Sequence, residues 1–198
     1  MTINFKIFSD YIWPFCYIGK GLVDRLKKEY AIDDQWVSFE LHPETPPTGM
    51  LLSERFKGYD LSSFYDQLRA RGKEVEVVFG SHTLLSNSRL ALMASEYARD
   101  QDRYDSFHEN MFHAYFTEGL DIGKPDVIAT VAKKSGLDEK ETLSAVSDSH
   151  YASRLNEARK EGELLGLTGI PLFIINNKHQ ITGAQPIETF RELLDKIK

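Results

Sequence analysis

The sequence has almost no cysteine: Cys16 is the only one among 198 residues. A single thiol cannot form a disulfide within the chain, so the disulfide framework of small secreted proteins is excluded. Dithiol exchange by two thiols of one chain is excluded as well, because it needs one thiolate to attack and a second thiol to resolve the mixed disulfide. A lone cysteine is typical of a reducing compartment, and we expect a cytoplasmic protein.

Long apolar runs and clustered positive charge are also absent. No window approaches the roughly 20 apolar residues of a membrane-spanning helix, so we expect no membrane association. Met1 is followed by alternating apolar and polar residues rather than by a basic segment and an apolar core, so we expect no secretory signal. The net charge is -6 and both signs are mixed along the chain. Without a basic stripe, a nucleic-acid partner is not expected.

The first forty residues predict a strand, a helix and a second strand. Residues 3–8 alternate apolar and polar side chains with the period of a strand. Pro14, a residue preferred in the first turn of a helix, opens a stretch with apolar residues at helical spacing up to Tyr30. Apolar residues between Trp36 and Leu41 predict the second strand.

The middle of the chain, about residues 53–166, predicts helices throughout, since apolar residues recur at spacings of three and four. Asn87 or Ser88 can cap one helix, Asp138 can begin another, and Gly136 suits the end of the helix between them.

After Pro171 the pattern changes back to two short strands and a closing amphipathic helix. Strand, helix, strand, long helical insert, two strands and helix predict an α/β protein: a thioredoxin-like domain at residues 1–41 and 166–198, with a large all-helical domain inserted at 42–165.

Five blocks of sequence carry a resemblance to a known family. They are Phe8-Ser9-Asp10 with Pro14 and Cys16-Tyr17-Ile18-Gly19; Phe39 to Thr45; Asn87 to Leu92; Phe112 to Phe116; and Gly166 to Ile175 with Ile181 to Pro186. In this order they resemble the DsbA-like thioredoxin family, and most of all its FrnE-like branch. Related branches are the 2-hydroxychromene-2-carboxylate isomerases and the kappa-class glutathione transferases, which carry serine in place of the first cysteine. The resemblance implies a thioredoxin-like fold and thiol-linked chemistry.

The resemblance also implies roles for individual residues. Trp13 occupies the position of the nucleophilic cysteine, Cys16 that of the resolving cysteine, and Pro171 that of a cis-proline facing them. In the family, the backbone of the residue before the proline, here Ile170, pairs with an extended thiol-bearing ligand. Trp13, Pro14 and Phe15 would then shape the thiol site.

Cys16 has two interpretations. It can be a small buried apolar side chain, or it can react alone and form mixed disulfides with small thiols. Because it lies three residues into the helix, we expect burial to raise its pKa and slow its attack.

Three further groups of residues are candidate sites. Glu40, His42 and Glu44 alternate along a strand end, but Pro43 interrupts the strand, so a metal or acid–base cluster is not favoured. The aromatic residues of the helix around Phe107 to Phe116 can line an apolar cavity or fill the core, and core packing is favoured. His108 and His113 are expected at the surface or core edge.

Two functions remain open. The first is an oxidoreductase or isomerase without the dithiol motif, which uses an external thiol such as glutathione, or Cys16 alone, at the Pro171 site. The second is a redox-inactive protein that binds a peptide or a small apolar ligand. A homodimer whose partner covers the site is compatible with both. We expect no metal and no tightly bound cofactor; a small thiol is the expected ligand of the first function.

Overall fold

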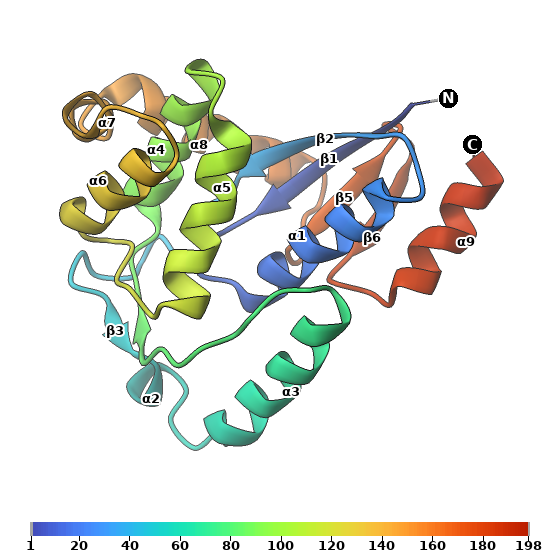
Figure 1. The fold of residues 1–198 in the computed structure, drawn as a ribbon, viewed down its shortest axis with the longest axis horizontal. Helices are drawn as coiled ribbons and strands as arrows, with labels where there is room; N and C mark the ends of the chain where they lie inside the picture. The colour runs from blue at the N-terminus through green and yellow to red at the C-terminus, as the bar shows by residue number, and fades with distance from the viewer. Residues whose placement is uncertain (1, 198) are drawn as a thin grey trace.

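A four-stranded mixed sheet is the centre of the computed structural model, which describes residues 2–197 (Figure 1). Its strands are β1 (Ile3–Ser9), β2 (Ile32–Ser38), β5 (Leu172–Ile175) and β6 (His179–Thr182), in the order β2-β1-β5-β6. β1 and β2 are parallel and joined by helix α1 (Pro14–Lys27), whereas β5 is antiparallel to β1 and β6. Segments from both ends of the chain thus share one sheet, and the predicted α/β class is confirmed.

The remaining helices come from the middle of the chain, apart from the last one. They are α2 (Leu52–Arg55), α3 (Leu61–Glu74), α4 (Arg89–Asp100), α5 (Tyr104–Phe112) with the π-helical turn η1 (His113–Thr117), α6 (Pro125–Lys134), α7 (Glu139–Ala145), α8 (Ser149–Leu164) and α9 (Ile187–Ile197). Helices α4 to α7 gather at one end of the sheet, while α9 lies at the other end and α3 lies beside α1 (Figure 1).

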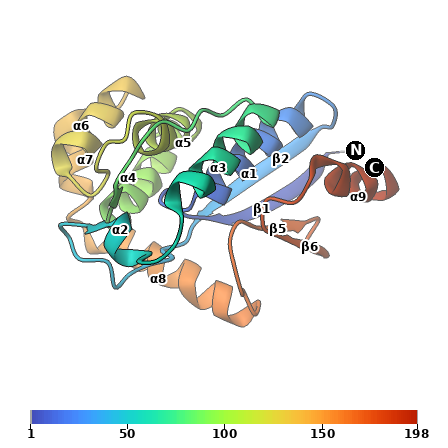
Figure 2. The same cartoon turned by 90° about the horizontal axis from the view of Figure 1, so that it is seen from below.

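Helices cover both faces of the sheet, as Figure 2 shows for α1 and α8. On one face Phe5 meets Phe173, which in turn meets Phe190 of α9 with ring centroids 4.9 Å apart. On the other face Lys6 forms an ion pair with Glu161 of α8. Adjacent residues of β1 point to opposite faces, so the strand period places these two contacts on opposite sides.

Local end signals in the sequence predict several helices correctly. Pro14 is at the first position of α1, and the Asp138 side chain accepts hydrogen bonds from two backbone N–H groups at the start of α7. Gly136 has a φ of 79°, a conformation in which glycine avoids the steric cost of a Cβ. At α4 the capping side chain is Asn87, whose Oδ1 accepts from Arg89 N–H at 3.0 Å, and not Ser88.

Two expectations are wrong in detail. The second strand begins at Ile32 rather than near Trp36. Its first residues include the polar pair Asp33 and Asp34 at a sheet edge, so this part of the strand has no apolar pattern by which it could be predicted. The middle segment is not helical throughout: β3 (Met50–Leu51) and β4 (Leu84–Leu85) form an antiparallel pair. This pairing depends on residues more than thirty positions apart.

Residues 75–88 after α3 form no helix, and the start of this segment packs on α1. Val75 and Val77 are buried there, and a Cβ added at Gly21 would lie 2.4 Å from the carbonyl oxygen of Val75. The absence of a side chain at Gly21 therefore allows this segment to reach the helix. Within residues 2–197 no helix is both long and apolar enough to cross a membrane.

Candidate functional site

The candidate site begins at the N-terminus of α1. Trp13 is the N-cap residue in an extended conformation, with φ -98° and ψ 114°, and it makes no side-chain capping hydrogen bond. Pro14 follows, and no acidic residue lies in the first turn. No acidic side chain of the first turn therefore neutralises the partial positive charge of this helix end.

Cys16 points away from this end and into the core. Its side chain is 0% exposed, and burial raises the pKa of the thiol from 9.0 to about 12. A thiol must ionise and meet its partner before it can exchange. The structure therefore favours the interpretation of Cys16 as a packed side chain.

Pro171 packs against α1 near Gly19. The Ile170–Pro171 peptide bond is cis, and both residues are buried. A Cβ added at Gly19 of α1 would lie 3.2 Å from Cγ of Pro171, so the proline packs directly on the helix. Pro171 accepts a hydrogen bond from Gly183 N–H at 2.7 Å through its carbonyl oxygen.

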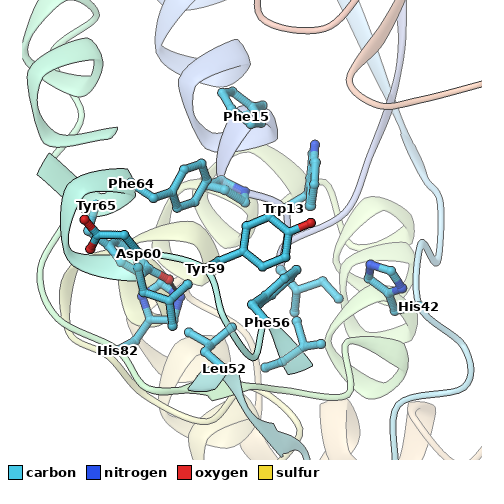
Figure 3. Close-up of a pocket in the computed structure, with 14 residues that line it drawn as sticks. Trp13, Phe15, His42, Leu52, Phe56, Tyr59, Asp60, Phe64, Tyr65 and His82 are labelled. Atoms are coloured by element: carbon cyan, nitrogen blue, oxygen red, sulfur yellow. Dashed lines mark hydrogen bonds between the residues drawn. The ribbon is translucent and has the colours of Figure 1, made fainter. Parts of the chain in front are cut away.

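A cavity of about 390 Å³ opens beside Trp13, and we call it the Trp13 pocket (Figure 3). Its walls come from the start of α1, from α2, α3 and the stretch between them, from His42 after β2, and from the segment before α4. They comprise Ile12, Trp13, Pro14, Phe15, His42, Leu52, Phe56, Tyr59, Asp60, Leu61, Phe64, Tyr65, His82 and Leu85. Of the residues expected at the site, Trp13, Pro14 and Phe15 line the pocket, whereas Cys16, Ile170 and Pro171 do not.

Aromatic rings form much of the wall. Phe15 contacts both Trp13 and Phe64, with centroid distances of 5.8 and 6.3 Å. Phe64 is 36% exposed and Tyr59 is 77% exposed, so both rings present apolar surface to water. Exposed apolar surface in a concave site is typical of a place where a ligand binds.

Polar groups gather at one side of the pocket, where Tyr65, Asp60 and His82 lie together opposite His42 (Figure 3). The Tyr65 hydroxyl and His82 Nε2 are 2.9 Å apart. Burial lowers the pKa of His82 to about 4 and raises the pKa of Tyr65 to about 12, so both are neutral at pH 7. Among residues 2–197, no lysine or arginine lines the pocket.

Comparison with known proteins identifies the family. The model of the DSBA-like thioredoxin domain matches residues 4–195. The chain belongs to the DSBA-like thioredoxin family.

Solved structures of DsbA-like proteins share the fold. A probable DsbA oxidoreductase from Streptomyces coelicolor has a TM-score of 0.89 at 21% identity and covers 98% of this chain and 89% of its own. A 2-hydroxychromene-2-carboxylate isomerase has a TM-score of 0.80 at 15% identity, and the match covers 100% of this chain and 96% of the isomerase. The cytosolic disulfide reductase DsbM from Pseudomonas aeruginosa has a TM-score of 0.73 at 16% identity, and the match covers 98% of this chain and 100% of DsbM. The predicted thioredoxin-like fold is thus confirmed.

A curated relative of similar length is YwbO from Bacillus subtilis, described as an uncharacterized protein. It is 27% identical over 195 residues, which is 98% of this chain and 96% of YwbO. This DSBA-like chain therefore matches its relative along almost its whole length.

Of the other candidates in this DSBA-like protein, His42 lines the Trp13 pocket, whereas Glu40, Glu44, His108 and His113 do not. Glu40 pairs with Arg89 at 2.7 Å and His42 with Glu44 at 2.9 Å. Within the described part of the chain, no three His, Cys, Asp or Glu side chains are placed to hold a metal ion. His108 was expected at the surface or core edge, but it is 4% exposed and stacks on Tyr104 with centroids 5.2 Å apart.

The aromatic stripe of α5 and η1 is core, as favoured from the sequence. Its members are at most 1% exposed and none lines the Trp13 pocket: Phe107, Met111, Phe112, Tyr115 and Phe116. The pocket residues that the sequence reasoning missed come from Leu52 to Tyr65 and from His82 to Leu85. The available signal was the group of aromatic residues at 56–65 inside an otherwise polar segment.

Proposed function

We propose that this DSBA-like protein binds a small apolar molecule in the Trp13 pocket and performs no thiol–disulfide exchange through Cys16. The observation that carries the proposal is the different placement of the Trp13 and Cys16 side chains at the start of α1. The Trp13 side chain lines an open cavity of about 390 Å³, whereas Cys16 is fully buried. Binding cavities for small molecules are commonly about 300–1,000 Å³ in volume and mostly apolar.

The composition of the walls supports an apolar ligand. A ligand that covers Phe64 and Tyr59 removes their exposed rings from water, and each 100 Å² of apolar surface removed contributes about 2.5 kcal/mol before the cost of association is subtracted. An acidic peptide or another strongly anionic ligand would meet no lysine or arginine among the described lining residues. This argues against a highly acidic ligand inside the cavity.

A second candidate is an enzyme that uses an external thiol such as glutathione. The N-terminus of α1 favours it, because this helix end has neither a capping side chain nor an acidic residue in its first turn. Such an end stabilises an anion, including the thiolate of a bound thiol. The structure of DsbM with GSH has the same fold, with a TM-score of 0.72. In this candidate the thiol lies along Ile170 and Pro171, and the Trp13 pocket holds the co-substrate.

A titration with the neutral fluorescent probe N-phenyl-1-naphthylamine tests the first candidate. We expect saturable enhancement of probe emission with the wild-type protein. Leu61→Trp, which fills the pocket, should weaken binding at least tenfold. Leu164→Trp is the matched control, because Leu164 is 89% exposed on α8 and does not line the pocket.

Absence of saturable binding, or equal loss in both variants, would rule out the pocket as the binding site. Calorimetry with glutathione on the same preparation separates the two candidates. Saturable heat from glutathione with no response to the apolar probe would favour the external-thiol enzyme.

A further inference from the structure

The polar side of the Trp13 pocket contains one pair of hydrogen-bonded side chains. His82 belongs to the segment after α3, and its ring packs against Tyr115 and Phe116 with centroid distances of 4.8 and 5.3 Å. Its Nε2 atom is 2.9 Å from the hydroxyl oxygen of Tyr65, which comes from α3. The aromatic contacts fix the imidazole ring, and the ring in turn fixes the position of the hydroxyl.

The other ring nitrogen determines which group donates in this hydrogen bond. His82 Nδ1 is buried and has no hydrogen-bond partner in the described chain. Because the pKa of His82 is lowered to about 4, the neutral ring carries one proton at pH 7. Buried N–H groups without an acceptor are rarer than unsatisfied acceptors. The proton is therefore assigned to Nε2, which donates to the Tyr65 oxygen.

This assignment leaves the proton of the Tyr65 hydroxyl without an acceptor. Among residues 2–197, His82 Nε2 is the hydrogen-bond partner found for the Tyr65 oxygen. A hydroxyl that already accepts one hydrogen bond remains a donor for a second partner. Tyr65 lines the cavity, so a bound ligand can supply that acceptor.

We propose that the Tyr65 hydroxyl anchors the ligand of the Trp13 pocket by donating a hydrogen bond to a carbonyl oxygen of a neutral, apolar molecule, with His82 as the positioning residue. This inference rests on the proposed function and names its ligand class. A carboxylate ligand is disfavoured, because Asp60 lies in the same wall and no lysine or arginine of the described chain lines the cavity.

Three probes of similar size test the anchor: 4-phenylbutan-2-one, 3-phenylpropanoate and propylbenzene, titrated by ligand-observed NMR. We expect the ketone to bind the wild-type protein about three- to tenfold more tightly than propylbenzene, the range of one neutral hydrogen bond. We expect 3-phenylpropanoate to bind no more tightly than propylbenzene. Tyr65→Phe should abolish the preference for the ketone and leave the affinity for propylbenzene within twofold.

The role of His82 is tested by the ratio of the affinities for the ketone and for propylbenzene. A general loss of packing would weaken both affinities and leave this ratio unchanged. His82→Phe should lower the ketone preference, and His82→Gln, which keeps an N–H donor, should restore part of it. Failure of all three probes to bind contradicts the proposed function itself. Binding of all three with an unchanged ratio in Tyr65→Phe contradicts only the anchor, and tighter binding of the carboxylate contradicts the neutral ligand class.

Discussion

A backbone hydrogen bond joins Trp13 and Cys16 across the first turn of α1, where the Cys16 N–H donates to the Trp13 carbonyl oxygen at 2.9 Å, yet their side chains have different surroundings. One side chain lines the open pocket and the other is fully buried. The sequence resemblance implies that these two positions correspond to the attacking and resolving thiols of dithiol proteins. In this protein an indole occupies the accessible position and a protonated thiol the buried one.

The first prediction concerns Cys16. The native protein should react with a small disulfide reagent at least 100-fold more slowly than the urea-unfolded protein at pH 8, because the thiol is buried and its pKa is raised to about 12. Absorbance of the released thiol measures both rates. Reaction of the folded protein at the unfolded rate would contradict the assignment of Cys16 as a packed side chain.

Trp13→Cys should restore thiol reactivity at the helix end. A cysteine at the N-cap of a helix is stabilised as a thiolate, and its pKa should fall below the ordinary value of about 8.5. Thiolate absorbance across pH measures this shift. Trp13→Ser is the matched control, and the variant pair should differ only in thiol chemistry. An unshifted pKa in Trp13→Cys would mean that this helix end no longer favours an anion.

Asp10 makes folding stability depend on pH. It is 1% exposed, and burial raises its pKa from 3.8 to about 6, despite hydrogen bonds from Leu41 N–H and Ser88. A raised pKa in the folded state contributes stability that is complete below the unfolded value and is lost as pH rises through the folded value. The difference in unfolding free energy, wild type minus Asp10→Asn, should therefore fall by about 2 kcal/mol between pH 4 and 6.

Urea denaturation of both proteins at several pH values measures this difference. Other titrating groups cancel in the subtraction unless they contact Asp10. A difference that stays constant or rises across this pH range would contradict the buried, proton-binding state of Asp10.

Gly21→Ala should destabilise the protein and weaken the pocket together. The added Cβ would lie 2.4 Å from the Val75 carbonyl oxygen, which displaces the segment that leads to His82. Overpacking of this kind costs about 1–3 kcal/mol. Gly169→Ala is the control, since its Cβ would meet its nearest neighbour at 3.7 Å. Thermal unfolding and probe binding should change in the first variant, and equal behaviour of both variants would contradict the close contact.

The parts of the fold that local sequence determines were predictable. Pro14 and Asp138 mark helix starts because their effects act within one turn. Edge strand residues such as Asp33 gave no apolar signal, and the pairing of β3 with β4 depends on contacts distant in sequence. The same limit applies to the site. Trp13 and Phe15 were identified through a contiguous motif, whereas Tyr65 and His82 meet only because α3 packs on α1 and the segment after α3 brings His82 against η1.

Trp13 emission in the Trp36→Phe variant tests the central claim most directly. Trp36 is 4% exposed and does not line the pocket, so this variant leaves Trp13 as the single indole, at the ligand site. We predict that N-phenyl-1-naphthylamine quenches Trp13 emission saturably, at the same concentrations that enhance the emission of the probe. Trp13 emission that stays unchanged while the probe saturates elsewhere, or a probe that never binds, would contradict a ligand-binding function for this pocket.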